Sequence, residues 1–172
     1  MPAGATRRSA CDTLRRVEVF LIRHAEAIPE SAALSDPHRH LTAIGRDQAR
    51  ALGDRLRWHD CAPTEVWSSP LVRAIQTAEL VANGLACGVL IEAVPALAPG
   101  EDVRTLAARL AALPAAAIVV VVGHEPNLSA LGTLLVGGQN MPALRLAQAA
   151  RIDDGQLRWR FACHADAPEM PR

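Results

Sequence analysis

The chain has 172 residues, of which 50% are hydrophobic and 21% are charged, proportions typical of one globular domain that exclude a disordered chain and a coiled coil. Its 18 basic residues balance its 18 acidic residues, and this net charge of zero argues against a nucleic-acid partner or an anionic membrane surface. Every basic residue is an arginine, so a local anion site would be lined by guanidinium groups, which bind phosphate bidentately.

The first predicted element is a buried strand. Residues 17–22 read VEVFLI, an apolar run rich in β-branched side chains that is too short for a helix and suits a parallel sheet. An irregular polar stretch with two prolines follows. Thr42 then has the position of an N-cap, and the segment after it predicts a helix that ends near Trp58.

A second strand and a second helix come next. Residues 65–67 form a short strand candidate. Directly after them, Ser68, Ser69 and Pro70 predict a helix that begins with a serine cap and a proline at its first position. Gly84 is the candidate for the end of this helix, because glycine is enriched just past helix termini.

The rest of the chain continues the alternation of strands and helices. We expect strands at residues 89–94 and 117–122, and helices at residues 101–113 and 127–135. The last segment predicts two strands joined by a tight turn at Asp154-Gly155. This order predicts an α/β fold, a three-layer α/β/α sandwich around a mostly parallel central sheet.

The ends of the chain and its cysteines suggest one domain in a reducing compartment. We expect a flexible tail over residues 1–16, a single domain over residues 17–165 and a second tail over residues 166–172. The longest apolar run, at residues 115–122, is too short to span a membrane. The four cysteines form no C-x-x-C pair, so we expect no zinc or redox site and a cytoplasmic location.

Residues suited to binding an anion follow three of the predicted strands. Arg23 and His24 follow the first strand, Ser69 and Arg73 follow the second, and His124 follows the strand at residues 117–122. In open α/β sheets, ligands bind beyond the carboxyl ends of the strands. We therefore expect these side chains to meet in one crevice and to bind a small anion such as phosphate.

Three sequence segments give this prediction a family. The segments VFLIRHAEA, SSPLVRAIQTAE and VVGHEPNLSAL, in this order, resemble the motifs of the histidine phosphatase superfamily, which is phosphoglycerate mutase-like in fold. The likeness extends from about Val17 to the C-terminal hairpin and is greatest for the SixA-type phosphohistidine phosphatase branch. It implies that His24 is the nucleophile, that Arg23 and Arg73 bind phosphate, and that His124 is the second histidine of the pocket.

General chemistry supports these roles. A largely neutral imidazole at pH 7 can attack phosphorus through a ring nitrogen, and its other nitrogen should donate to a backbone carbonyl. We expect the charge on the transferring phosphoryl group to be met by Arg23, Arg73 and a protonated His124, with Ser69 as a possible further phosphate contact. Water then hydrolyses the phosphohistidine intermediate, and the scheme requires no metal and no cofactor.

A general acid is not evident at the position that many superfamily members use. That pattern is Leu-x-Glu downstream of the second arginine, and here Pro99 stands two residues after Leu97. The chain also leaves little length for a helical lid. Both features favour a phosphohistidine on a protein surface, because its imidazole leaving group is easily protonated. The remaining candidate acids are Glu26, Asp36, Glu101 and Asp102.

Other interpretations stay open at this point. The domain could hydrolyse small phosphomonoesters, or it could be a phosphate-binding module with little turnover. His38 and His40 form an H-x-H pair that could border the pocket or bind a metal, although no third ligand is spaced for it. The partner is therefore a phosphorylated protein or a small phosphorylated substrate, and the oligomeric state is not predicted.

Overall fold

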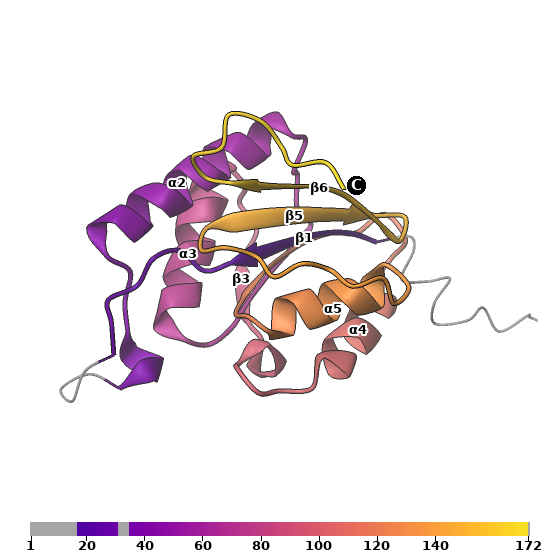
Figure 1. Cartoon of the computed structure of the whole chain (residues 1–172), viewed down its shortest axis with the longest axis horizontal. Coiled ribbons are helices and arrows are strands. Elements are labelled where there is room, and N and C mark those ends of the chain that lie inside the picture. Colours follow the sequence, from indigo (N-terminus) through magenta and orange to yellow (C-terminus); the bar gives the residue numbers. More distant parts are fainter. Residues whose placement is uncertain (1–16, 31–34, 172) are drawn as a thin grey trace, which may run out of the picture.

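The computed structural model describes residues 17–30 and 35–171, and the expected N-terminal tail over residues 1–16 lies outside the described residues. A six-stranded sheet runs through the middle of the molecule in the order β3-β2-β4-β1-β5-β6 (Figure 1). The first four strands along the chain are parallel: β1 (Glu18–Arg23), β2 (Glu65–Ser68), β3 (Ile91–Ala93) and β4 (Ile118–Gly123). Antiparallel β5 (Gln148–Asp153) and β6 (Gln156–Ala162) extend the sheet beyond β1.

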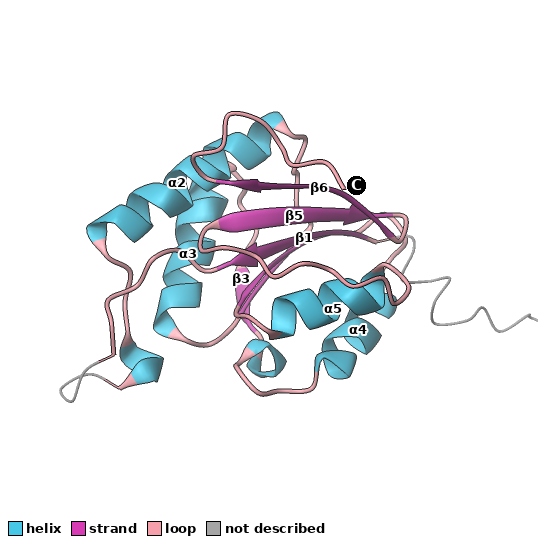
Figure 2. Cartoon of the chain, in the orientation of Figure 1, coloured by secondary structure: helices cyan, strands magenta, loops and turns pink. Residues whose placement is uncertain are grey.

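Helices cover both faces of this sheet (Figure 2). On one face lie α2 (Ala43–Trp58) and α3 (Val72–Gly84), and on the other lie α4 (Val103–Ala111) and α5 (Asn127–Leu135). Two short 3-10 helices complete the described elements, η1 (Asp36–His38) and η2 (Pro95–Leu97). The predicted three-layer α/β/α sandwich is confirmed.

Strand β4 shows how the sequence pattern produces two cores. Its valines are all buried, and Val120 and Val122 join the cluster under α2 and α3, whereas Val119 and Val121 join the cluster under α4 and α5. Successive strand residues point to opposite faces, so a continuous apolar run is what a strand covered on both sides requires. The strand lies between β1 and β2, at the centre of the parallel part.

The predicted start of α2 is confirmed in detail. The hydroxyl oxygen of Thr42 accepts a hydrogen bond from the amide of Gly45 at 2.9 Å, which satisfies one of the free N–H groups of the first turn. The predicted hairpin turn is also present, with positive φ angles of 50° at Asp154 and 67° at Gly155.

The predicted start of α3 is wrong. The helix begins at Val72, its N-cap is Leu71, and no side chain caps it. Ser68 is the last residue of β2, and the amide of Ser69 still donates to the carbonyl of Val122 in β4 at 2.9 Å. Because of this pairing, the backbone stays extended beside β4 as far as Ser69. Both serines are therefore buried at the end of β2, and neither caps the helix.

The last residues return to the edge of the sheet. Residues 166–172 are described as far as residue 171, and Glu169 forms an antiparallel bridge with Arg160 of β6. No helix within the described residues is long and apolar enough to cross a membrane.

Candidate active site

The carboxyl ends of three parallel strands bring the predicted site residues together. His24 follows β1, Ser69 follows β2 and His124 follows β4, while Arg73 reaches the same place from the first turn of α3. The ring centroids of His24 and His124 are 5.0 Å apart. His24, Ser69, Arg73 and His124 are all at least 92% buried. The structure therefore brings together these side chains, as expected from the sequence.

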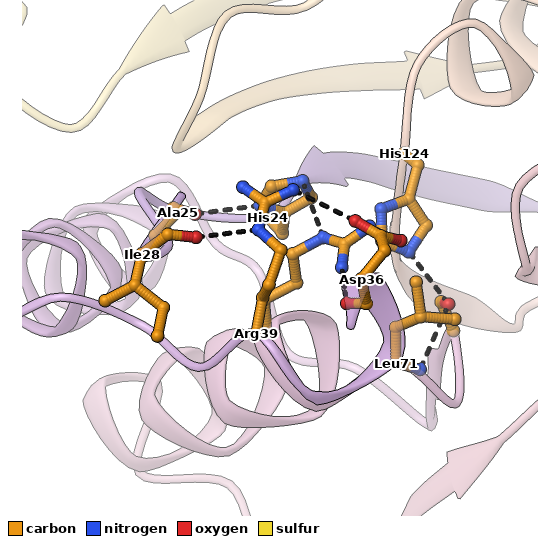
Figure 3. A network of polar contacts seen from close by, with 9 residues as sticks. His24, Ala25, Ile28, Asp36, Arg39, Leu71 and His124 are labelled. Atoms are coloured by element: carbon orange, nitrogen blue, oxygen red, sulfur yellow. Dashed lines mark hydrogen bonds and ion pairs between the residues drawn. The ribbon is translucent and has the colours of Figure 1, made fainter. Parts of the chain in front are cut away.

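The hydrogen bonds of His24 define its tautomer (Figure 3). Its Nδ1 lies 2.8 Å from the carbonyl oxygen of Ala25, and since a carbonyl can only accept, Nδ1 carries the proton. Its Nε2 accepts from Nε of Arg73 at 3.3 Å. The lone pair of Nε2 is thus directed into the pocket, on the side of a guanidinium group.

The side chain of Thr77, in α3, binds the backbone of the residue that follows His24. The amide of Ala25 donates to the hydroxyl oxygen of Thr77 at 3.1 Å, and that hydroxyl donates to the carbonyl of Arg73 at 2.7 Å. Thr77 is fully buried. Sequence reasoning did not single out this threonine, and its only signal is its position one helical turn after Arg73.

Both histidines are neutral in the unliganded protein at pH 7. Burial lowers the pKa of His24 to about 4. The hydrogen bond to the Ala25 carbonyl raises this pKa, and the positive charges of the arginines at positions 73, 23 and 39 lower it further. Burial, followed by the neighbouring His24 and Arg73, lowers the pKa of His124 to about 3. Desolvation and nearby positive charge thus disfavour the imidazolium of His124 without ligand, and the expectation that His124 is protonated during phosphoryl transfer stays a prediction. Its Nε2 lies 2.8 Å from the hydroxyl oxygen of Ser69.

Arg73 is bound by η1 as well as by His24. Its Nη1 donates to the main-chain carbonyl of Asp36 at 2.8 Å, and its Nη2 donates to the carboxylate Oδ2 at 3.0 Å. The other carboxylate oxygen, Oδ1, accepts from Nη1 of Arg39 at 2.9 Å, and Nε of Arg39 donates to the carbonyl of Ile28 at 2.6 Å. Figure 3 shows Asp36 and Arg39 next to His24.

These contacts change the interpretation of Asp36. Burial raises its pKa, but hydrogen bonds from Arg73 and Arg39 outweigh burial, and the net shift is downward. Asp36 is consequently a carboxylate at neutral pH, a poor proton donor. Arg39 was not predicted as a site residue, although its i, i+3 spacing from Asp36 in the sequence allows such an ion pair.

Arg23, at the end of β1, has unused hydrogen-bonding capacity. Its Nη1 donates to the carbonyl of Leu144 at 2.9 Å. Its Nε is buried and has no hydrogen-bond partner among the described residues. A buried guanidinium donor left without a partner suits an anionic ligand, since an unmet charged donor is costly.

The other candidate acids are occupied elsewhere. The carboxylate of Glu26 accepts from the hydroxyl of Thr42 at 2.7 Å, at the start of α2. The carboxylate of Asp102 accepts from the amide of Arg104 at 2.9 Å and caps α4. Glu101 is exposed next to it. Within the described residues, no hydrogen bond joins the carboxylates of Glu26, Glu101 and Asp102 to His24, Arg73 or His124.

His38 and His40 are exposed, and Nδ1 of His38 lies 2.9 Å from the hydroxyl of Ser35. Over residues 17–30 and 35–171, no group of three or more His, Cys, Asp and Glu side chains is arranged to hold a metal ion. The pair therefore has no third ligand in the part of the chain that the structure describes.

Comparisons with known proteins show the family and the fold of this chain. The family model of the histidine phosphatase superfamily (branch 1) matches residues 19–99. The chain is 31% identical to the phosphohistidine phosphatase SixA of Escherichia coli strain K12, over 85% of this chain and 94% of that protein. A structure of SixA complexed with tungstate has a TM-score of 0.78 and 31% identity, with 85% of this chain and 97% of that chain covered. A mycobacterial glucosyl-3-phosphoglycerate phosphatase shares the fold, with a TM-score of 0.58 and 21% identity over 83% of this chain and 95% of that one.

Proposed function

The chain belongs to the histidine phosphatase superfamily, and on this premise we propose that it hydrolyses phosphohistidine in a protein through a phosphoryl intermediate on Nε2 of His24. The observation that supports the proposal most directly is the hydrogen bond of 2.8 Å from Nδ1 to the Ala25 carbonyl, which leaves Nε2 unprotonated. A buried, neutral and oriented imidazole is what a nitrogen nucleophile needs.

The proposed reaction has two displacements. In the first, the Nε2 lone pair of His24 forms a bond to phosphorus while the bond from phosphorus to the substrate imidazole breaks, and the leaving imidazole takes that electron pair and a proton from solvent. In the second, a water oxygen attacks phosphorus, the bond to Nε2 breaks, and inorganic phosphate leaves with neutral His24 restored. Arg23 and Arg73 would stabilise the negative charge on the equatorial oxygens in both steps.

Two features support phosphohistidine as the substrate. Of the four candidate acids, Asp36 is ionised, Glu26 and Asp102 accept hydrogen bonds at helix starts, and Glu101 is exposed with no hydrogen bond to the site among the described residues. A substrate whose leaving group needs no strong acid fits such a site, and an imidazole meets that condition. The relative with 31% identity is itself described as a phosphohistidine phosphatase. The proposed mechanism uses no metal ion.

The cytoplasmic location stays a prediction. Cys61, Cys87 and Cys163 are free thiols, which fits a reducing compartment.

A substrate panel tests the proposal. Wild-type protein, His24→Ala and the control His164→Ala, which changes an exposed histidine, would be compared on a phosphohistidine protein, a phosphoserine peptide and sugar phosphates. We expect wild type and His164→Ala to prefer phosphohistidine, and His24→Ala to lose at least about a thousandfold in kcat/KM. Rapid quenching with labelled substrate should trap an acid-labile, base-stable label on wild type only.

Other results would select another function. Full activity of His24→Ala would contradict the proposed intermediate. Turnover of sugar phosphates far above that of phosphohistidine would indicate a small-molecule phosphomonoesterase, and tight phosphate binding without turnover would indicate a binding module.

A further inference from the structure

The carboxylate of Asp36 lies beside the place where a phosphoryl group would be bound. In an arginine side chain, Nε and Nη2 share one edge of the guanidinium plane, the edge that can hold two oxygens of one phosphate. Here Nε of Arg73 donates to Nε2 of His24 at 3.3 Å, and Nη2 donates to Oδ2 of Asp36 at 3.0 Å. A phosphoryl group on Nε2 of His24 would meet this same edge, next to the carboxylate.

The carboxylate of Asp36 also lies between two arginine side chains. One of its oxygens pairs with Arg73, whose side chain is 5% exposed, and the other pairs with Arg39, whose side chain is 23% exposed. The Asp36 side chain itself is 38% exposed, so its carboxylate lies between the buried Arg73 and solvent. One negative charge therefore offsets part of the positive charge of two arginines beside Nε2 of His24.

We propose that Asp36 is a specificity-determining residue, which disfavours substrates with an anionic group near the phosphoryl group and admits those with a neutral leaving group such as imidazole. The inference rests on the proposed function and narrows its substrate class. Two unit negative charges about 6–8 Å apart at a partly exposed site repel each other enough to change affinity on the order of tenfold.

Two ligands that differ by one carboxylate isolate this effect. Glycerol 3-phosphate and 3-phosphoglycerate carry the same phosphoryl group, and only the second has a carboxylate. Both would be measured as competitive inhibitors of phosphohistidine-peptide hydrolysis, and the quantity of interest is the ratio of their inhibition constants. Any effect of a substitution on the phosphoryl group itself cancels in this ratio.

The decisive variant is Asp36→Asn, which removes the charge and keeps an oxygen that can accept from Arg73. We expect it to shift the ratio about tenfold in favour of 3-phosphoglycerate, since Arg73 and Arg39 lose their shared counter-charge. Asp36→Glu keeps the charge and should keep the wild-type preference. The matched control is Asp47→Asn, because Asp47 forms an ion pair with Arg50 at the same i, i+3 spacing on the exposed surface of α2.

The alternative roles of Asp36 give different results. If Asp36 only orients Arg73, Asp36→Asn raises both inhibition constants equally and the ratio stays at the wild-type value. If Asp36 only competes with phosphate for Arg73, both constants fall equally and the ratio again stays unchanged. Either result overturns the proposal, as would an equal shift in Asp47→Asn. Thermal unfolding of each variant checks that the fold is intact.

Failure of the proposed function can be recognised separately. If no phosphoryl-His24 forms in the wild type, the two ligands can still be compared by titration calorimetry on the same variants. The charge preference of the pocket and the identity of the nucleophile are thereby tested by independent measurements.

Discussion

At the scale of single residues, His24 combines burial with a fixed proton. Burial and the neighbouring arginines keep the imidazole neutral, and the Ala25 carbonyl assigns its one proton to Nδ1. The same burial makes the contacts of Arg73 stronger than they would be in water, because the local dielectric constant is lower. The nucleophile and its stabilising cation thus depend on a common cause, the exclusion of water at the ends of β1 and β4.

The lowered pKa of His24 can be measured by NMR titration of its ring resonances, assigned by their loss in His24→Ala. Since burial lowers the pKa of His24 to about 4 and that of His124 to about 3, both rings should stay neutral as the pH falls from 7.5 to 5. Protonation, and with it loss of the nucleophilic lone pair, is expected only below that range. A midpoint near the ordinary value of 6.5 for either ring would show that the site is wetter than described.

At the scale of elements, η1 and α3 are linked through one side chain. Arg73, in the first turn of α3, donates hydrogen bonds to Asp36 of the 3-10 helix η1. Arg39, which follows η1, donates a hydrogen bond to the carbonyl of Ile28. The sequence predicted an irregular stretch before α2, which is correct in outline. Its attachment to the active site comes from the ion pair between Asp36 and Arg73, which are 37 residues apart, and no local pattern specifies that contact.

Helices α2 and α3 approach closely because glycines face each other where they pack. A Cβ atom on Gly53 of α2 would lie 2.5 Å from the carbonyl oxygen of Val81, and one on Gly84 of α3 would lie 2.8 Å from the amide nitrogen of Asp54. Real Cβ contacts essentially never come this close, and the atoms involved are backbone, so the helices would have to separate.

We expect Gly53→Ala to lower the free energy of unfolding by about 1–3 kcal/mol, although alanine is intrinsically the better helix residue by about 1 kcal/mol. Urea unfolding followed by circular dichroism measures the change. Gly88→Ala is the control, because nothing lies within 4 Å of its added Cβ. An increase in stability for Gly53→Ala would mean that helix propensity outweighs the contact and that the two helices can move apart at little cost.

At the scale of the whole molecule, the sheet joins two cores into one unit. Trp159 lies in the core under α2 and α3, and Trp67 lies in the core under α4 and α5, so each face carries its own fluorescent reporter. Strand β4 contributes side chains to both cores, and its backbone pairs with β1 and β2. Loss of one layer should therefore unfold the other.

Truncation of one fully buried leucine on each face tests this coupling. Leu52→Ala, in α2, and Leu110→Ala, in α4, should each lower the free energy of unfolding by about 2–5 kcal/mol. In a background where the exposed Trp58 is replaced by phenylalanine, Trp67 and Trp159 should report the same midpoint in each variant. Two separate midpoints would show that the helical layers unfold independently.

The sequence by itself determined the fold class and the order of the main elements, and it led to the prediction of an anion site formed by Arg23, His24, Arg73 and His124. Apolar runs of about four to eight residues indicate strands, and capping residues indicate helix starts, so both kinds of element can be predicted from local sequence. In open α/β sheets, ligands bind beyond the carboxyl ends of the parallel strands. The structure places Arg73 after β2 and His124 after β4, as expected, and their binding of an anion stays a prediction.

Tertiary structure decided the rest. Only the fold shows that the amide of Ser69 still pairs with β4, that Asp36 binds both Arg73 and Arg39, that Thr77 binds the amide of Ala25, and that both histidines of the site are neutral without ligand. Each of these depends on groups distant in sequence that come within a few ångströms, or on the exclusion of water from a shared cavity. Periodicity and propensity describe neighbours along the chain, whereas charge, protonation and hydrogen bonding at a site are set by neighbours in space.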